Sequence, residues 1–349
     1  MNRKFYLDLA ANGLRMPIGT HLVLHQQSDP GAIVLDGERL GGVLIETARR
    51  FGTPLAVPLM DLTLEKDALV RACGVPADEA EGYHFTSPPE APAAIPRTPR
   101  MRASCRAITR VAAEGSLVPM GMSIGPFSLM TKLVLDPITP VYLAGEGLTA
   151  AEEPEIALIE SLLALGERVI SEYLIAQVDA GARAIIICEP AANLVYFSPA
   201  QLEKNVAPFE HYVMEPMRRL AALLADRGVD LVFHDCGELT EDMVRRFGTL
   251  GAAMISFGSS RRLWEDAALV PNDTVLYGNL PTKRFSARQL TPAAVEELSR
   301  ELIEKMRAVG HPFILGSECD VLSVPGSEAD IMGKVDAFLH CSCHAAGAS

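Results

Sequence analysis

Short apolar runs, most of them bounded by Gly, Pro or Asp, recur along the whole chain. Runs of this kind are typical of buried parallel strands, which are apolar on both faces. The first run is the least regular, since Pro17 and Gly19 interrupt it. Eight runs are predicted to be strands: Leu14–Leu24, Leu55–Met60, Leu117–Met122, Ala182–Cys188, Val229–His234, Ala252–Phe257, Thr274–Tyr277 and Pro312–Gly316.

Helical patterns with clear start signals separate these runs. Thr149-x-x-Glu152 has the form of a capping box and predicts the start of a long helix. The stretch 198–201, Ser-Pro-Ala-Gln, combines an N-cap residue, a proline in the first turn and a capping-box glutamine. Two more helices are predicted to begin after Thr240 and after Thr291.

Strands and helices alternate along nearly the whole chain of 349 residues. About eight such units predict the α/β fold class and a single (β/α)8 TIM-type barrel, with residues 1–349 as one domain. The proline-rich stretch 87–100 interrupts the pattern between the second and third strands. We interpret it as a surface loop, with a substrate lid as the alternative. Residues 341–349 are expected to form a flexible tail.

The formal net charge of −13 argues against a nucleic-acid-binding protein, because phosphate binding needs a basic surface. The N-terminus lacks the apolar stretch of a signal peptide, and no apolar run approaches the length of a membrane span. The seven cysteines are odd in number and irregularly spaced. They favour free thiols or metal ligands over disulfides, and therefore a reducing, cytoplasmic location.

Two of the predicted strands end in groups that can bind a metal. His234 and Cys236 follow the apolar residues 231–233, and side chains at i and i+2 of extended backbone point to one side. Cys319 follows the eighth strand. The C-terminal ends of barrel strands meet at one mouth, so the three residues are predicted to form a zinc site. Three protein ligands leave the fourth tetrahedral position open, as in catalytic zinc sites.

Other polar residues follow strands at the same predicted mouth. Glu189, after the fourth strand, is either a further zinc ligand, a partner to a ligand or a helix-cap partner. His21 and His25 share a face near the end of the first strand. They are candidates for substrate binding or acid–base support, with core packing as the alternative. Asp61, at the end of the second strand, either has a role in the site or caps the next helix.

The remaining cysteines carry less information about function. The motif Cys341-x-Cys343-His344 has metal-like spacing but lies in the tail, so adventitious binding is the favoured interpretation. Three further cysteines are interpreted as packing residues: Cys73, Cys105 and Cys188.

Several segments resemble the uroporphyrinogen decarboxylase superfamily. They include Pro58–Glu65, the Gly-Pro-Phe turn at 125–127, the pair Glu189-Pro190, and Tyr277–Leu280. The most specific element is His-x-Cys followed at long range by Cys. It resembles the zinc-binding pattern of the corrinoid-dependent methyltransferase branch, which includes methylcobalamin:coenzyme M methyltransferases. In this chain the pattern falls on His234, Cys236 and Cys319.

The resemblance implies a zinc-dependent methyltransferase. Such an enzyme moves a methyl group between methylcobalamin, a corrinoid held by a partner protein, and a small molecule whose heteroatom zinc activates. A thiol such as coenzyme M is slightly favoured, and O-demethylation of methoxylated aromatics is the alternative, because the ligands alone do not choose the direction. Asn279 is predicted to shape its turn or to contact substrate. Glu318 is predicted to contact substrate, to occupy the open zinc position or to face solvent.

Two further interpretations compete with this one. The decarboxylases of the superfamily carry an arginine-rich segment after the first strand that receives substrate carboxylates, but the matching stretch 21–28 contains no arginine. A porphyrinogen-type decarboxylase is therefore the weaker alternative. The other is a non-catalytic barrel with structural zinc that only binds a corrinoid protein, and the open coordination position argues against it. The stretch 256–260 also departs from relatives, which often have an acidic residue there.

Overall fold

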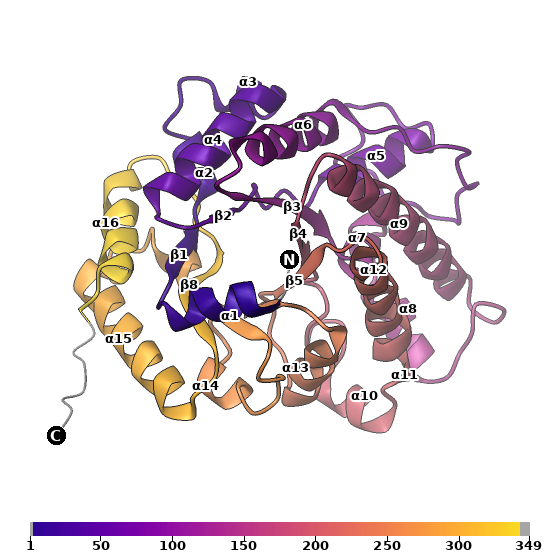
Figure 1. Cartoon of the computed structure of the whole chain (residues 1–349). Coiled ribbons are helices and arrows are strands. Elements are labelled where there is room, and N and C mark those ends of the chain that lie inside the picture. Colours follow the sequence, from indigo (N-terminus) through magenta and orange to yellow (C-terminus); the bar gives the residue numbers. More distant parts are fainter. Residues whose placement is uncertain (1–2, 343–349) are drawn as a thin grey trace.

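The computed structural model describes residues 3–342, so the tail from Cys343 onward lies outside it. Eight parallel strands curl around a common axis with helices on the outside (Figure 1). This arrangement is the predicted (β/α)8 TIM-type barrel. Each predicted run overlaps one strand, and four strands extend past the predicted end. The strands are β1 (Arg15–Ile18), β2 (Leu55–Ala56), β3 (Val118–Ile124), β4 (Ala184–Cys188), β5 (Asp230–Asp235), β6 (Met254–Phe257), β7 (Val275–Leu280) and β8 (Phe313–Asp320).

Helices occupy the connections between consecutive strands, as the alternating pattern predicts. The α-helices are α1 (Arg3–Ala11), α2 (Thr20–Leu24), α3 (Pro30–Ile33), α4 (Gly37–Arg50), α5 (Leu64–Ala72), α6 (Pro99–Glu114), α7 (Pro126–Leu133), α8 (Ile138–Gly145), α9 (Pro154–Asp179), α10 (Pro199–Lys204), α11 (Ala207–Phe209), α12 (Glu215–Ala225), α13 (Glu241–Phe247), α14 (Leu263–Asp266), α15 (Pro292–Val309) and α16 (Glu328–Leu339). Shorter helical turns of other types are η1 (Glu210–Met214), η2 (Gly248–Leu250) and η3 (Thr282–Arg284).

Three of the predicted helix starts are confirmed. Ser198, Thr240 and Thr291 each accept, through the side-chain oxygen, a hydrogen bond from the backbone N–H three residues later. The capping-box role of Gln201 is wrong, because its side-chain amide instead donates to the carbonyl oxygen of Val141 (3.2 Å). The serine therefore caps α10 without a reciprocal partner.

The predicted helix start at Thr149 is wrong, because α9 begins at Pro154. Glu152 does accept hydrogen bonds from the backbone N–H (3.0 Å) and the hydroxyl (2.8 Å) of Thr149. Helical backbone is unfavourable for a residue that precedes a proline, and Glu153, just before Pro154, has an extended backbone. The capping pair therefore closes a local turn, and the helix starts after it.

Two other boundaries differ from the predictions. The first run divides at Gly19 into β1 and α2, so His21 lies on a helix and His25 is the C-cap of that helix. The proline-rich stretch is free of helix and strand only to residue 98. There the side chain of Thr98 accepts a hydrogen bond from the backbone N–H of Met101 (3.4 Å), and α6 begins at the next residue, a proline.

Two layers of apolar side chains form the core. Along β4, Ala184, Ile186 and Cys188 belong to the cluster inside the barrel, whereas Ile185 and Ile187 belong to the cluster between the sheet and the helices. Successive side chains of a strand point to opposite faces, so a strand covered on both sides is apolar at every position. The continuous apolar runs of the sequence follow from this double burial.

Helix α1 lies across the end of the barrel where the strands begin (Figure 1). Tyr6 of this helix is fully buried and its hydroxyl donates to the carboxylate of Asp230 at the start of β5 (3.1 Å). The sheet order places β1 and β2 at its two ends, and the hydroxyl of Thr20 donates across this seam to the carbonyl oxygen of Val57 (2.6 Å). The opposite end of the barrel, where the strands finish, is left for a functional site.

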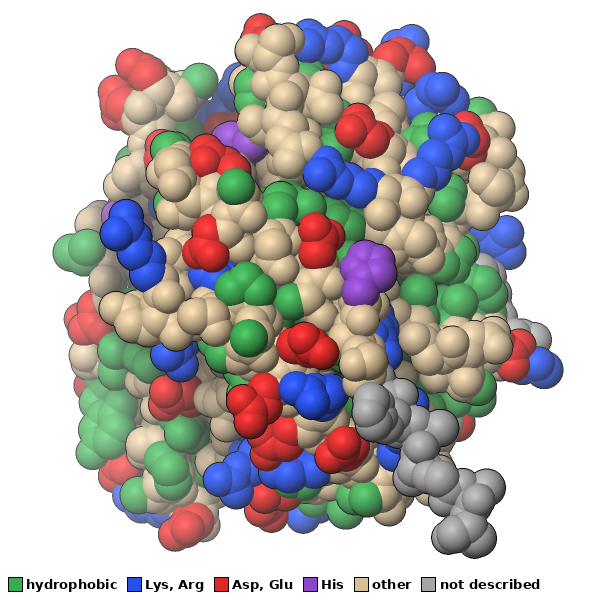
Figure 2. Space-filling view, turned by 90° about the vertical axis from the view of Figure 1, so that its left-hand side faces the viewer, with side chains coloured by type: hydrophobic (Ala, Val, Ile, Leu, Met, Phe, Trp, Pro, Cys, Tyr) green, Lys and Arg blue, Asp and Glu red, His purple; other side chains and the backbone are tan. Residues whose placement is uncertain are grey.

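Charged side chains of both signs cover the surface. On the side shown in Figure 2, acidic and basic residues are interspersed and form no continuous basic area. Within residues 3–342, no helix combines the length and the apolar composition that crossing a membrane requires.

Helices α4 and α6 pack closely because a glycine of α4 faces α6. A Cβ at Gly41 would lie 2.7 Å from Cβ of Arg110 and 3.1 Å from the carbonyl oxygen of Ala107. At the next residue, Gly42, an added Cβ would meet nothing within 4 Å. An added methyl group should therefore destabilise the fold at Gly41 but not at Gly42.

We expect Gly41→Ala to lower the free energy of unfolding by about 1–3 kcal/mol, because the new methyl group must push α4 away from α6. Gly42→Ala is the matched control and should raise it by about 0.5–1 kcal/mol through helix propensity. Urea denaturation of both variants measures these changes. Equal effects of the two substitutions would contradict the close packing of α4 on α6.

Glu65 of α5 is buried against β3. One of its carboxyl oxygens accepts a hydrogen bond from the hydroxyl of Ser123 (2.6 Å), and the other has no hydrogen-bond partner in the described part of the chain. Burial, only partly offset by the bond from Ser123, raises the pKa of Glu65 to about 7. The folded protein therefore keeps this proton at pH values where the unfolded chain has lost it.

The free energy of unfolding should consequently fall as pH rises between about 4.5 and 7, and Glu65→Gln should remove this contribution. The measured quantity is the free energy of unfolding of the variant minus that of the wild type. This difference should be on the order of 3 kcal/mol larger at pH 8 than at pH 5. Denaturant titrations at the two pH values measure the difference. Glu297→Gln, at an exposed position of α15, is the control and should show none; an effect of Glu65→Gln that is independent of pH would refute the assignment.

Candidate metal centre

Strand β5 places two of the predicted ligands inside the mouth of the barrel. Val232 belongs to the cluster inside the barrel and Phe233 to the outer cluster. Because side chains alternate, His234 and then Cys236, just after the last residue of β5, lie on the same side as Val232. His234 is 2% exposed and Cys236 is partly buried.

Cys319 reaches the same point through an irregular stretch of β8. It lies within this strand, and not after it as predicted. Ile314 belongs to the inner cluster and Leu315 to the outer one, so plain alternation would put Cys319 on the outer side. The pairing of β8 with β1 changes register between Met16 and Ile18. A local irregularity of this kind re-aims side chains, and Cys319 meets the other two residues.

The three predicted ligands lie together. One ligand atom from each of His234, Cys236 and Cys319 lies within 4.8 Å of the other two. Nδ1 of His234 is 3.0 Å from Oγ of Ser256 on β6, and this contact orients the imidazole ring. The buried Nε2 has no hydrogen-bond partner among residues 3–342. A buried, unsatisfied ring nitrogen in a group with two thiols fits a metal ligand.

The two thiols titrate as a pair. The hydrogen bond between them holds the pKa of Cys236 well below its ordinary value, whereas this bond, together with burial, raises the pKa of Cys319. Burial acts to lower the pKa of Lys283, but the Cys236 thiolate and Glu318 outweigh it and raise that pKa. One thiolate next to a lysine ammonium is the charge arrangement expected at neutral pH.

A cavity of about 360 Å³ opens beside the three residues. Its walls are mostly apolar and include Met60, Leu62, Phe285 and Ile331. One imidazole and two thiols are ligands that suit zinc, and the cavity leaves space for a fourth group at the metal. The residues present therefore fit a zinc site of the catalytic type.

Glu189 does not join this group. It is fully buried, and its carboxylate accepts a hydrogen bond from the backbone N–H of Ser128 (2.5 Å) in the first turn of α7. It fills the space that a side chain at Gly125 would need, since a Cβ there would lie 1.5 Å from Oε2. Helix α7 has no side-chain cap of its own at residue 125. Of the predicted alternatives for Glu189, the geometry favours the partner of a helix N-terminus over the zinc ligand.

Glu318 and Asn279 hold loops at the mouth. The carboxylate of Glu318 accepts hydrogen bonds from the backbone N–H groups of Ser259 (2.9 Å) and Lys283 (3.3 Å). Asn279 lies inside β7 and not in a turn, and its side-chain amide donates to the carbonyl oxygen of Gly258 (2.8 Å). Neither residue lines the cavity, so substrate contact by either one stays a prediction.

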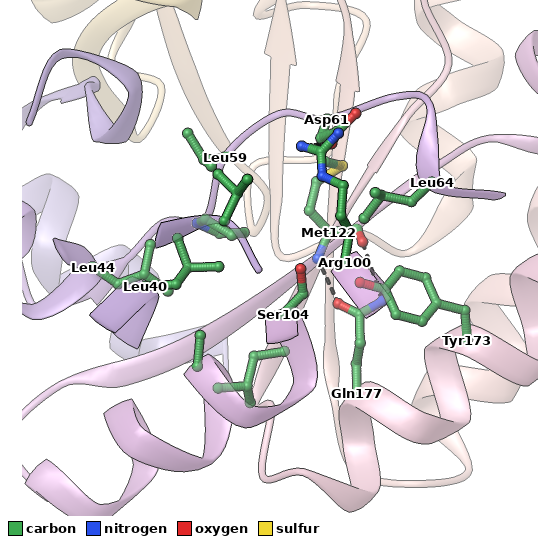
Figure 3. A pocket seen from close by; sticks show the side chains of 14 residues that line it. Leu40, Leu44, Leu59, Asp61, Leu64, Arg100, Ser104, Met122, Tyr173 and Gln177 are labelled. Atoms are coloured by element: carbon green, nitrogen blue, oxygen red, sulfur yellow. Dashed lines mark hydrogen bonds and ion pairs between the residues drawn. The ribbon is translucent and has the colours of Figure 1, made fainter. Parts of the chain in front are cut away.

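A second cleft, of about 350 Å³, contains the other candidates. His21, His25 and Asp61 line it together with Arg100 of α6. The two imidazole rings stack with their centroids 4.1 Å apart. Asp61 and Arg100 form an ion pair, and Figure 3 shows these two side chains meeting at the edge of a smaller cavity of about 30 Å³. The cleft therefore contains one arginine paired with a carboxylate and two stacked imidazole rings.

The cleft and the cavity are neighbours that share the lining residues Met60, Asp320 and Leu322. Nδ1 of His21 accepts a hydrogen bond from the backbone N–H of Ser323 (3.0 Å). Burial, with a smaller contribution from His25, lowers the pKa of His21 to about 4. His21 is therefore uncharged at neutral pH, with its proton on Nε2. The structure thus brings six of the predicted residues to one mouth in two groups, the three candidate ligands in the cavity and three residues in the cleft: His21, His25 and Asp61.

Three residues at the mouth were missed by the sequence analysis as site residues: Ser256, Lys283 and Arg100. Ser256 lies in the stretch that departs from relatives, and its place near the end of the sixth strand was the available signal. No motif or spacing in the sequence singles out the other two, which lie in η3 and α6.

The fold and the site define a class of protein, a TIM-type barrel with a candidate His-Cys-Cys metal centre at its mouth. Residues 32–330 match the family Uroporphyrinogen decarboxylase (URO-D), and the chain belongs to this family. It is 30% identical over 198 residues to uroporphyrinogen decarboxylase of Agrobacterium fabrum. That match covers 53% of this chain and 52% of the relative, about half the length of each.

Among solved structures, a methyltransferase from Methanosarcina mazei is similar to this chain, with a TM-score of 0.68. The match covers 97% of this chain and 98% of that chain, at 17% sequence identity. At this identity, the likeness shows that the two proteins share a fold.

We expect the purified protein to hold about one zinc per chain, and Cys236→Ala or Cys319→Ala to lose most of it, because each removes a ligand. Ser256→Ala should keep all three ligands but lower zinc affinity about 10- to 100-fold, because the ring of His234 loses its orienting partner. Elemental analysis by mass spectrometry measures the zinc, and circular dichroism should stay unchanged because the barrel core does not need the metal. Cys73→Ala, at the C-cap of α5, is the control and should retain zinc. Full occupancy in both ligand variants would exclude the site.

Proposed function

We propose that this chain is a zinc-dependent methyltransferase that moves a methyl group between the corrinoid of a partner protein and a heteroatom of a small substrate. The observation that carries the proposal is the group of His234, Cys236 and Cys319, with the unsatisfied Nε2 of His234, beside a cavity of about 360 Å³. A purely structural zinc site is closed by four protein ligands, and within residues 3–342 the group contains three. Membership of the URO-D family and the fold shared with a methyltransferase are consistent with this proposal.

The same three residues would hold the zinc ion, which when bound makes a thiol more acidic and its sulfur more nucleophilic, or polarises an ether oxygen. The chain itself contributes in two ways: it orients the ligands, and it excludes water from the cavity. Ser256 orients the imidazole of His234. Phe285 and the other apolar residues of the cavity keep water away from the reacting atoms, which strengthens electrostatic interactions there.

The choice of heteroatom separates two versions of this function. Methylation of a thiol is slightly favoured, because the sequence pattern of the ligands is closest to that of the thiol-methylating branch. O-demethylation of methoxylated aromatics is the second candidate. The observation that favours it is the second cleft of about 350 Å³. This cleft shares Met60 and Leu322 with the cavity beside the candidate ligands (the metal cavity) and offers more space than a small thiol needs.

A porphyrinogen-type decarboxylase is the third candidate, because the family and the relative from Agrobacterium fabrum carry that name. Substrates with several carboxylates need several cations to bind them. The stretch 21–28 supplies no arginine, and Arg100, which lines the second cleft, is paired with Asp61. These charges favour methyl transfer over decarboxylation.

The corrinoid protein would present its cofactor at the mouth of the barrel, because the candidate ligands lie there and α1 covers the other end. In the described part of the chain, five cysteines are free: Cys73, Cys105, Cys188, Cys236 and Cys319. Free thiols agree with the reducing cytoplasm that we propose as the location of this protein.

Methyl transfer can be followed by the absorbance of cobalamin. We expect zinc-loaded protein to convert methylcobalamin in the presence of a thiol, or to methylate Co(I) cobalamin in the presence of a methoxylated aromatic. Cys319→Ala should lower the rate by at least about 100-fold, because a ligand is lost. The control Cys73→Ala should leave the rate unchanged. Absence of transfer in both directions, with zinc bound, would contradict the proposed function, and release of carbon dioxide from a porphyrinogen would support the decarboxylase.

A further inference from the structure

One wall of the metal cavity is formed by the segment 281–287, which follows β7 and contains η3. Four residues of this segment line the cavity: Thr282, Lys283, Phe285 and Ser286. The segment therefore sets much of the shape and charge of the space beside the candidate ligands.

A buried lysine holds this segment in place. Lys334 of α16 is 0% exposed, and its ammonium donates to two carbonyl oxygens of the segment, at 2.5 and 3.1 Å, and to the carboxylate of Asp330 (2.5 Å). All three of its protons are used in this way. On the other side of the segment, Glu318 accepts a hydrogen bond from the backbone N–H of Lys283 (3.3 Å). The backbone that carries the side chain of Lys283 is therefore anchored from two directions.

Lys283 brings a positive charge to the rim of the cavity. Its ammonium lies 3.4 Å from the carbonyl oxygen of Cys236, next to the candidate ligands. It is the only Lys or Arg side chain among the residues found to line this cavity within residues 3–342. Asp320 also lines the cavity, where it meets the second cleft. An ammonium at the edge of a mostly apolar cavity is suited to the charged end of an organic anion.

We propose that Lys283 selects the substrate of this cavity, because its ammonium pairs with the carboxylate of a small thiol or methyl ether whose heteroatom lies at the candidate metal centre. This inference rests on the proposed function and names its substrate class. Lys283 is then the residue that determines specificity. Arg284, the next residue, is exposed and does not line the cavity, so it provides a matched control for the loss of one positive charge.

Calorimetric titration of the zinc-loaded protein tests the substrate class with two matched pairs. The first pair is mercaptopropionate and its methyl ester, and the second is methoxybenzoate and its methyl ester. In the pair that binds, the acid should bind about tenfold more tightly than the ester. Lys283→Gln should remove this preference and Lys283→Arg should keep it, with zinc content unchanged in both. Arg284→Gln should behave as the wild type.

The inference is overturned if the acid binds no better than its ester, if neither pair binds, or if the preference survives Lys283→Gln. Retention of the preference in Arg284→Gln, together with its loss in Lys283→Gln, supports it. Failure of the substrate class is distinct from failure of the proposed function, because methyl transfer is measured separately. If the esters support methyl transfer at the same rate as the acids, the proposed methyltransferase function is retained and the role of Lys283 is overturned.

Discussion

The parallel pairing of eight strands is the constraint on which the candidate site depends. All strands run in the same direction, so the ends of β5, β6 and β8 lie at one rim although they are far apart in the sequence. The register of the sheet places His234 opposite Ser256, which then contacts Nδ1 of the ring. The hydrogen bond that orients the imidazole is therefore a consequence of backbone pairing. A change of register at that pair would remove it.

Buried polar side chains hold the loops around this rim. Glu189 binds the first turn of α7, Glu318 binds backbone N–H groups on two loops, and Lys334 binds two carbonyl oxygens of the segment 281–287. Burying such groups is unfavourable unless they form hydrogen bonds, so each of them ties its loop to one position. Glu318 and Lys334 in this way hold the segment 281–287, which forms one wall of the cavity.

The charges at the mouth are concentrated at the candidate ligands and Lys283. The Cys236 and Cys319 pair readily gives one thiolate, and Lys283 lies beside it. The second cleft holds an uncharged His21 and a paired Arg100, so it adds polar groups with little net charge. A family named for a decarboxylase thus includes a chain whose mouth brings together a histidine and two cysteines that could hold a metal ion.

The apolar runs were enough to predict the strands and the barrel, because a strand buried on both faces must be apolar at every position. The pair His234 and Cys236 was also readable, since i and i+2 share a side of a strand. Three features depended on tertiary structure: the inward turn of Cys319, the choice of helix capping among the predicted roles of Glu189, and the position of Lys283 at the cavity. Each is set by contacts between segments distant in the sequence. Local patterns record burial and backbone conformation, but they do not record which distant groups come to lie beside one another.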